Sequence, residues 1–366
     1  MCSAPSQVVS PPARQQGLPG ASHGYSKVRE IGQGSYGKAI LVQDQEGKLY
    51  VMKTIDMSSM DKKQRKDAIN EVRVLSLLKH PYIVSYRESF ADGGTLAIVM
   101  DYADGGDLYQ RIVSTRRAGH SLVERAILRW VTEAALALKY MHDKHVLHRD
   151  LKSQNLFLTA GDRLRVGDFG ISRVLENTAA FARTAIGTPY YLSPEICQEK
   201  PYSFGSDIWA LGCVLYEMAA LKVPFDAQNL QALVQKIVRG PLPQIPVAYS
   251  ADLRQLCWDL LHREQAQRPT ATDIIQRRCV QDEIRRMLVE ERAKTAVQQQ
   301  SPQSVHVGRA SSGAGSASCA AGGGVAVSQP GSANVRRDWR PASYRAHSPA
   351  RGRVSRPDAN HYNPQP

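Results

Sequence analysis

The chain has 366 residues, of which 42% are hydrophobic and 22% are charged, and its formal net charge is +13. These proportions are ordinary for a globular protein, and the length allows one large two-lobed domain with tails or two medium domains. From Ala296 to the end the chain carries eight arginines and two aspartates, so about half of the excess charge lies there and favours acidic partners.

Cysteine usage and the first residues bear on the cellular compartment. Six cysteines are scattered without a Cys-x-x-Cys pair, which predicts neither a zinc site nor a disulfide framework and favours a reducing compartment. Residues 1–5 lack an apolar signal core, and Cys2 stands where myristoylation would need a glycine. The most apolar stretch, residues 209–221, is interrupted by Glu217 and is too short to cross a bilayer of about 30 Å. The sequence therefore predicts a cytoplasmic protein with no transmembrane segment.

The first elements in chain order are strands. Residues 1–23 are rich in Pro, Ser and Gln, which predicts disorder. Residues 24–103 follow as a β-rich lobe with one helical pattern over residues 61–78, where Ala68, Val72 and Leu75 share a face. The strand-like runs of this lobe cover residues 26–31, 39–43, 50–55, 83–90 and 96–101.

Residues 104–287 have the pattern of a larger, mainly helical lobe. Ser206 or Asp207 is a candidate helix start, and so is Thr270, which has Asp273 three residues later. A β-rich lobe followed by a helical lobe predicts an α+β fold with two lobes. Helical periodicity covers residues 122–142, 206–221, 230–239, 251–261 and 270–279.

The helical pattern continues as an extension over residues 288–299. A stripe of Ile284, Met287, Leu288 and Ala293 either packs on the domain before it or binds a partner helix, and no heptad series is long enough for a coiled coil. Residues 300–366 are rich in Gly, Ser, Ala and Gln and then in Arg and Pro. They cannot bury enough apolar surface to offset chain ordering, which predicts a disordered basic tail.

A glycine-rich loop, Gly32-Gln33-Gly34-Ser35-Tyr36-Gly37, lies between two strand-like runs. Glycines let backbone amides approach phosphate oxygens where a side chain would collide. Alone, this spacing also fits a structural turn or a Rossmann loop, but a Rossmann loop would be followed by a helix. Because residues 38–43 have the pattern of a strand, we expect a β-hairpin lid over nucleotide phosphates.

Lys53 stands at the end of a strand-like run. A single lysine is usually a solvated charge, but Glu71 lies on the helical pattern that follows, beside its apolar face. An ion pair between the two would hold the ammonium group against the α- and β-phosphates. Because such a pair forms only when the helix is docked, it could act as a switch.

The stretch His148-Arg149-Asp150-Leu151-Lys152-Ser153-Gln154-Asn155, followed by Asp168-Phe169-Gly170, carries the chemistry. Transfer of a phosphoryl group to a hydroxyl needs a carboxylate that accepts the proton, which suits Asp150. It also needs oxygen ligands for Mg²⁺, which suits Asn155 and Asp168. Two polar loops that carry acids by chance would not match both motifs and Ser193-Pro194-Glu195 in order.

From about residue 25 to residue 287 the chain resembles a protein kinase, and these motifs are the signature set of that family. Stretches such as Ile-Val-Met-Asp-Tyr at 98–102 and Gly-Thr-Pro-Tyr-Tyr-Leu-Ser-Pro-Glu at 187–195 resemble the NIMA-related (NEK) serine/threonine kinases. The resemblance implies a bilobal kinase fold, ATP and Mg²⁺ as cofactors, and protein substrates phosphorylated on serine or threonine. It also implies a role in cell-cycle, microtubule or cilium and flagellum regulation.

The resemblance assigns roles to individual residues. Asp150, Lys152 and Lys53 are the expected catalytic residues, with Lys152 on the γ-phosphate, as in serine/threonine kinases. Asp207 is expected to brace the catalytic loop, and Arg268 to pair with Glu195. The residues expected to contact the nucleotide or its metal are Ile31, Gly32, Gly34, Gly37, Ala39, Val51, Lys53, Glu71, Met100 (the gatekeeper), Asp101, Ala103 (with Asp101 and Tyr102, the hinge), Asp107 (on the ribose), Asn155, Phe157 and Asp168.

The nucleotide pocket departs from the general kinase pattern in a paired way. Kinases usually have valine after the glycine loop and alanine two places before the lysine, whereas this chain has Ala39 and Val51. Both are expected to pack against adenine, so the exchange keeps the total volume about constant, which cores tolerate well. Ser193 for alanine before Pro194-Glu195 resembles NEK sequences.

Substrate selection can be predicted at one position. Kinases that prefer basic substrates have a glutamate just before the metal-binding asparagine, where this chain has Gln154. We therefore expect weak selection for arginine upstream of the acceptor, and the resemblance implies an apolar residue three places before it.

Residues 168–195 are expected to form the activation segment. Phosphorylation of Thr184 would add roughly −1.5 to −2 charge that could pair with Arg149 and order the segment. Thr188 is the competing phosphorylation site, although in Gly-Thr-Pro it is better placed to hydrogen-bond the catalytic loop.

Two interpretations of the basic tail stay open. It could bind acidic surfaces such as tubulin tails, RNA or membrane lipids, with nucleic acid the less favoured, or it could be a solvated tail phosphorylated at Ser301 and Ser348, which precede prolines. Cytoskeletal, basal-body, ciliary or nuclear association would follow from the first. The tail arginines, interleaved with Trp339 and Tyr344, are Arg336, Arg337, Arg340, Arg345, Arg351, Arg353 and Arg356.

The sequence leaves two rival functions to consider. A pseudokinase scaffold would normally lack Lys53, Asp150 or Asp168, and all three are present. In the other alternative the basic tail performs the main function, as a cytoskeletal or nucleic-acid binder with an accessory kinase.

Overall fold

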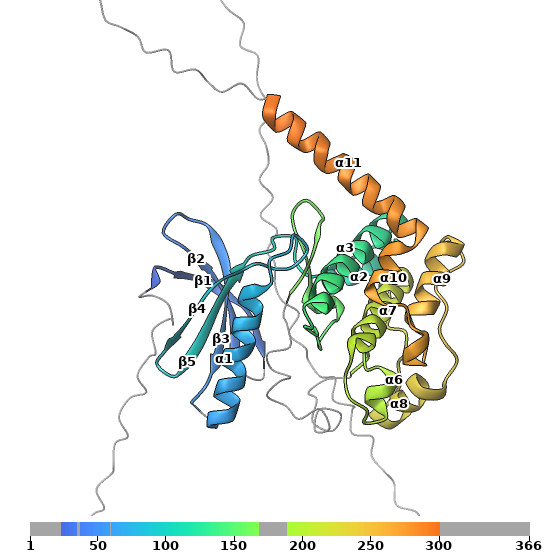
Figure 1. Ribbon diagram of the computed structural model, residues 1–366, viewed down its shortest axis with the longest axis horizontal. Coiled ribbons are helices and arrows are strands. Elements are labelled where there is room, and N and C mark those ends of the chain that lie inside the picture. Colours follow the sequence, from blue (N-terminus) through green and yellow to red (C-terminus); the bar gives the residue numbers. More distant parts are fainter. Residues whose placement is uncertain (1–22, 35–36, 59, 168–188, 301–366) are drawn as a thin grey trace, which may run out of the picture. The chain divides into compact units, whose positions relative to one another are not determined.

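A five-stranded antiparallel sheet with one helix against it forms the first part of the fold in the computed structural model (Figure 1). The structure describes residues 23–34, 37–58, 60–167 and 189–300. The sheet has the order β1-β2-β3-β5-β4. Its strands are β1 (Ser26–Gly34), β2 (Gly37–Gln43), β3 (Leu49–Asp56), β4 (Tyr86–Asp92) and β5 (Thr95–Asp101), which confirms the five predicted strands.

The strands carry apolar residues at consecutive positions, which gives the sheet two apolar faces. One face holds a cluster that includes Val42, Tyr50, Met52 and Val99, all nearly inaccessible to solvent. The opposite face carries Ile55, Leu96 and Ile98, which belong to the main core together with helix α1 (Lys62–Leu77). Successive strand residues point to opposite faces, so a sheet that is covered on both sides needs apolar residues at consecutive positions.

Helix α1 begins at the capping box that Asp61 and Gln64 form. Asp61 accepts the backbone N–H of Gln64 (2.8 Å), and the Gln64 side chain accepts that of Asp61 (3.0 Å). Two of the N–H groups that a helix start leaves unpaired are thereby satisfied. The helix buries Ala68, Val72 and Leu75 against the sheet, which confirms the predicted face.

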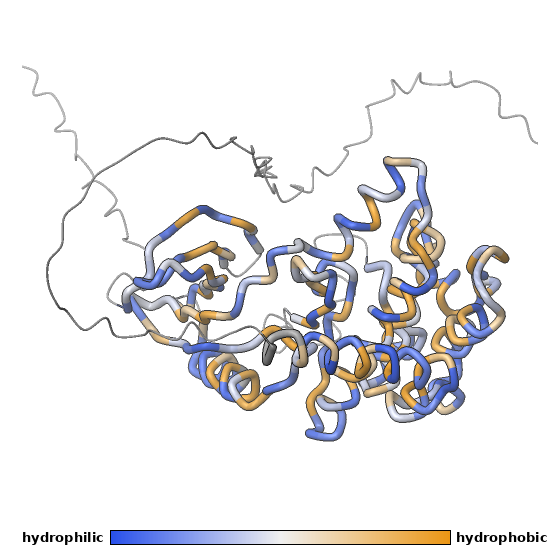
Figure 2. Tube along the Cα trace, turned by 90° about the horizontal axis from the view of Figure 1, so that it is seen from above, coloured by the Kyte–Doolittle hydropathy of each residue, from blue (hydrophilic) through white to orange (hydrophobic). Residues whose placement is uncertain are grey.

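The second part of the fold is helical and centres on α7 (Phe204–Ala220), most of whose residues are buried. Figure 2 shows hydrophilic and hydrophobic residues alternating along the chain, as expected where each helix buries one face. A short hairpin of β6 (Leu156–Leu158) and β7 (Leu164–Val166) precedes residue 168. The other helices are α2 (Leu108–Arg117), α3 (Glu124–Asp143), η2 (Ser153–Asn155), α6 (Pro194–Cys197), α8 (Leu230–Arg239), α9 (Ala251–Leu260), η3 (Gln265–Gln267), α10 (Ala271–Gln276) and α11 (Arg278–Gln300).

Helix starts were predicted with mixed success. Thr270 caps α10 and forms a capping box with Asp273, as predicted. The start at Ser206 or Asp207 was wrong, because α7 begins at Phe204 after Ser203. Both polar residues are fully buried inside the helix, where they bind other parts of the chain. The hydroxyl of Ser206 also accepts the backbone N–H of Ser203 (3.3 Å) in a capping box, so Ser206 belongs to the helix start as well. The polarity of Asp207 reflects tertiary hydrogen bonds and not a helix end.

Several elements differ from the sequence patterns. Helix α2 and the β6–β7 hairpin were not predicted. The pattern over residues 270–279 is not one helix, because the backbone of Arg277 is extended (ψ 140°) and separates α10 from α11. On α11, Met287 is buried and Ile284 packs on the core, whereas Leu288 (54% exposed) and Ala293 are exposed, so only half of the predicted stripe is buried.

Helix α11 packs against α3, which favours the prediction of docking on the domain over a partner helix. None of the described helices is long and apolar enough to cross a bilayer.

The predicted ion pair between Glu195 and Arg268 is confirmed. Arg268 donates from both terminal nitrogens to the two carboxylate oxygens, at 2.8 and 2.7 Å, and both residues are buried. Burial opposes the ionisation of Glu195, but Arg268 and the hydroxyl of Ser206 hold its pKa below the usual value. This buried bidentate ion pair connects α6 to the loop before α10.

Candidate active site

The loop of residues 148–155 is anchored by a buried carboxylate. Asp207 accepts the backbone N–H groups of His148 (3.0 Å) and Arg149 (3.1 Å). Its other donors are the ring of His142 (2.9 Å) and the hydroxyl of Tyr202 (2.6 Å). Burial opposes ionisation of Asp207, but His142, with help from His148 and Tyr202, holds its pKa below the usual value. The predicted brace of this loop is thus confirmed.

Three predicted site residues meet on this loop. Lys152 Nζ donates to Asp150 Oδ2 (2.8 Å), and Asn155 Nδ2 donates to the same oxygen (2.9 Å) and to the backbone carbonyl of Asp150 (2.7 Å). Asp150 is therefore held from two sides in an orientation that leaves it partly exposed. Arg149 has a positive φ of 66°, a conformation that only the surrounding contacts make favourable for this residue type.

The loop is joined to the strand that leads towards residue 168. The Asn155 carbonyl accepts the N–H of Gly167 (3.0 Å), and the ring of buried His148 lies 3.2 Å from the Gly167 carbonyl. A Cβ on Gly167 would lie 2.7 Å from Val84 and 3.0 Å from the Phe157 ring, so only glycine fits. These contacts hold Gly167, the residue before Asp168, beside Asn155.

One face of the sheet gathers the residues predicted to contact the nucleotide. Strand register places Ala39 opposite Lys53 and Val51 opposite Met100, so these four side chains share a face. All four are half-buried, whereas Ile55 and Ile98 farther along the same face are covered by the core. The two positions of the predicted exchange, Ala39 and Val51, therefore lie on neighbouring strands of one face.

The glycine-rich loop joins β1 to β2, and Gly34 pairs with Gly37 across the turn. The prediction that a strand and not a helix follows the loop is confirmed. Ile31 and Gly32 are half-buried, and the register of β1 on β2 shifts between Glu30 and Gly32. Gly37 is fixed by packing, since a Cβ there would lie 1.6 Å from the Thr54 carbonyl oxygen on β3.

The predicted hinge connects the two parts of the fold. Asp101 donates its N–H to the Ser85 carbonyl (2.9 Å), and buried Ala103 follows. Asp107 caps α2 by accepting the N–H of Gln110 (2.8 Å), and its backbone forms a bridge with Phe157 of β6. Burial raises the pKa of Asp107 despite that bond. The cap gives this carboxylate a structural role in addition to its predicted contact with the ribose.

The sequence analysis did not identify residues whose role depends on contacts with distant parts of the chain. Gly105 follows the hinge, and a Cβ there would lie 2.6–2.7 Å from the carbonyl oxygens of Thr159 and Leu158. Tyr191 donates to buried Glu217 and lies 3.0 Å from the hydroxyl of Ser153 in the loop. Burial raises the pKa of Glu217 and, with the charge of Glu217, that of Tyr191. No sequence signal marks these contacts, because their partners are distant along the chain.

The donor set beside Asp150 fits a hard cation with phosphates. The Asn155 amide nitrogen donates two hydrogen bonds to Asp150, and these fix the direction of the Asn155 amide oxygen. An amide oxygen is a ligand type that Mg²⁺ accepts. In the described part of the chain no three His, Cys, Asp or Glu side chains gather as a metal site.

Several predicted residues lie outside the described part of the structure. They are Asp168 with Phe169 and Gly170, the phosphorylation candidates Thr184 and Thr188, residues 1–22 and 301–366, and the side chain of Glu71.

A family model described as the protein kinase domain matches residues 25–280. The chain belongs to the protein kinase family. Within the family it is of the NIMA-related type, because curated kinases that are 44–49% identical to it are Nek kinases. Serine/threonine-protein kinase Nek1 of Mus musculus is 49% identical over 265 residues, which are 72% of this chain and 22% of that protein.

Two further relatives agree. Serine/threonine-protein kinase Nek4 of Mus musculus is 44% identical over 281 residues, 76% of this chain and 35% of its own length. The probable serine/threonine-protein kinase nek3 of Dictyostelium discoideum is 46% identical over 257 residues, 69% of this chain and 23% of its own. The kinase chain thus spans well under half the length of these relatives.

The packing of Gly37 gives a test of the lid. Replacing Gly37→Ala should lower stability by about 1–3 kcal/mol, because the new methyl group would push β2 away from β3. Gly32→Ala is the matched control, since its Cβ would meet nothing closer than Ala39 at 3.8 Å. Thermal unfolding without nucleotide measures both, and equal midpoints would contradict this packing.

Proposed function

We propose that the chain is an ATP-dependent serine/threonine protein kinase that transfers the γ-phosphoryl group of Mg-ATP to protein substrates. The observation that carries this proposal is the cluster of Asp150, Lys152 and Asn155 on a loop anchored by Asp207. A carboxylate held by a lysine and an amide is suited to orient a hydroxyl and accept its proton.

Each residue of the cluster has one task in the proposed reaction. The acceptor oxygen bonds to the γ-phosphorus as the bond from that phosphorus to the bridging oxygen breaks, ADP leaves, and the hydroxyl proton passes to Asp150. Lys152 offsets negative charge on the transferred group. Asn155 and Asp168 would hold Mg²⁺, which neutralises charge on the triphosphate.

The sheet face would bind the nucleotide. Ala39 and Val51 would pack on adenine with Met100 behind them and Phe157 below, while backbone groups of Asp101 and Ala103 would hydrogen-bond its edge.

The phosphates would lie next to the same face. Lys53, supported by Glu71, would hold the α- and β-phosphates under the loop of Gly32, Gly34 and Gly37, with Ile31 beside it. The supporting observation is that Ala39, Val51, Lys53 and Met100 share one half-buried face. Asp107 would contact the ribose.

The domain limits and regulation belong to the same proposal. Residues 24–103 and 104–287 would form the two lobes, with residues 288–299 as an extension and residues 1–23 and 300–366 as tails. Phosphorylated Thr184 would pair with Arg149, with Thr188 as the competing site. The basic tail would take an acidic partner such as tubulin, in keeping with cell-cycle, microtubule or ciliary regulation at the cytoskeleton, basal body, cilium or nucleus.

The proton-accepting role of Asp150 is tested by Asp150→Asn. Transfer of radiolabelled phosphate from ATP to casein and to a degenerate peptide library should fall at least about 100-fold, since general-base assistance is typically worth that much. Asp143→Asn is the control, because Asp143 is an exposed acid that pairs with Lys139 (2.5 Å). Transfer that survives Asp150→Asn would overturn the mechanism.

Substrate choice is tested on a peptide array. The wild-type chain should favour an apolar residue three places before the acceptor and show weak selection for upstream arginine. Gln154→Glu should raise the rate on arginine peptides roughly 1.5- to 5-fold, as expected for an exposed ion pair of about 0.2–1 kcal/mol. Gln235→Glu, which adds the same charge on the exposed side of α8, should change nothing. Strong arginine preference in the wild type would refute the prediction.

A further inference from the structure

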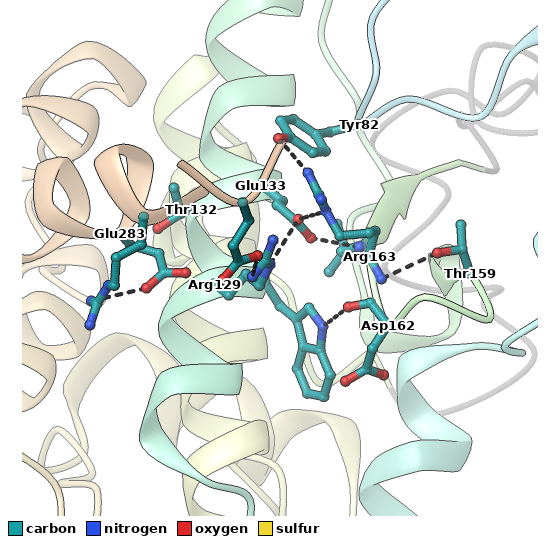
Figure 3. Close-up of polar contacts among 12 residues, drawn as sticks. Tyr82, Arg129, Thr132, Glu133, Thr159, Asp162, Arg163 and Glu283 are labelled. Atoms are coloured by element: carbon teal, nitrogen blue, oxygen red, sulfur yellow. Dashed lines mark hydrogen bonds and ion pairs between the residues drawn. The ribbon is translucent and has the colours of Figure 1, made fainter. Parts of the chain in front are cut away.

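A buried carboxylate on α3 is the centre of a charge network on the far side of the β6–β7 hairpin. Glu133 is inaccessible to solvent and accepts Arg163 Nε (2.8 Å) and the backbone N–H of Leu164 (2.6 Å). Arg129 Nε lies 3.5 Å from the same carboxylate (Figure 3). Burial raises the pKa of Glu133, and the two arginines with the Leu164 N–H offset only part of that effect. The Leu164 N–H and the two arginines thus offset part of the cost of burying this carboxylate.

Two glutamates of helix α11 contact these two arginines. Glu290 accepts Arg129 Nη1 (2.6 Å) and also pairs with Arg125 (3.0 Å). Glu291 lies 3.5 Å from Arg163. The hydrogen bond from Arg129 holds the pKa of Glu290 below its usual value. Glu290 and Glu291 thus connect α11 to each of the two guanidinium groups around Glu133.

The network continues towards the proposed metal site. Arg163 Nη2 donates to the hydroxyl of Tyr82 (3.2 Å), as Figure 3 shows. The backbone carbonyl of Tyr82 accepts the N–H of Val166 (2.8 Å), and the Val166 carbonyl accepts the N–H of Val84 (2.8 Å). Val166 ends β7 two residues before Asp168. A continuous set of contacts therefore runs from α11 to the strand that presents the proposed Mg²⁺ ligand.

We propose that Glu290 and Glu291 are positioning residues that, through Arg129 and Arg163, hold Tyr82 and β7 in the arrangement needed to present Asp168. The matched kinase domain ends at residue 280, so both residues lie beyond it. The extension is then a working part of the catalytic unit. The catalytic half of this inference rests on the proposed function, whereas the structural half does not.

Hydrogen exchange in the full-length chain tests the structural half. In Glu290→Ala/Glu291→Ala the amides of Val84 and Val166 should exchange at least about tenfold faster, because the Arg163–Tyr82 contact loosens. Asp282→Ala is the matched control, since this acid lies on the same helix and pairs with Arg285 (2.5 Å). Unchanged exchange in the double variant, or equal acceleration in the control, would overturn the inference.

Kinetics test the catalytic half. The double variant should raise the KM for Mg-ATP at least threefold while the KM for peptide stays the same and the thermal midpoint stays near that of Asp282→Ala. A merely structural role would lower the active fraction and leave KM unchanged, so faster exchange with unchanged KM would overturn the positioning claim. A wild-type chain that transfers no phosphate would refute the proposed function instead, and the exchange result would still decide the structural half.

Discussion

The carboxylate of Asp207 is fully buried and collects four hydrogen bonds, two of them from the backbone of the loop that carries Asp150. A buried charge is tolerable only when it is well paired, so the loop must adopt the path that brings both N–H groups to the carboxylate. The positive φ of Arg149 belongs to that path. Asp150, Lys152 and Asn155 take their mutual geometry from it.

Other buried acids connect the active site to the helical core in the same way. Glu195 is held by Arg268, Glu217 by Tyr191 beside Ser153, and Glu133 by Arg163. Each joins a loop to a helix. Because breaking one partner of such a pair leaves an uncompensated charge, these contacts define single positions for the loops more sharply than apolar packing does. The proposed role of α11 extends this arrangement to a helix beyond the matched kinase domain.

The sequence predicted the sheet, α1 and the cluster around Asp150 because these depend on local patterns and on motifs with specific chemistry. It did not predict α2 or the β6–β7 hairpin, whose strands have only three residues each and carry little periodicity. Gly105 and Gly167 are needed because of neighbours distant in the chain, which no local pattern reveals. Ser206 belongs to the capping box at the start of α7, whereas Asp207 resembled a helix start because buried polar residues and capping residues are the same types. Leu288 was placed on a buried stripe, but it is exposed.

The most direct measurement is the turnover of Asp207→Asn in the full-length chain. Asparagine keeps the shape but offers one acceptor oxygen in place of two, so at least one backbone N–H of the loop loses its partner. We expect kcat to fall at least about tenfold, as for a lost interaction of more than about 1.4 kcal/mol, while the variant remains folded by circular dichroism. Asp273→Asn, at an exposed capping residue of α10, should keep full activity. A folded Asp207→Asn variant with wild-type kcat would show that this carboxylate does not set the geometry of the loop that carries Asp150.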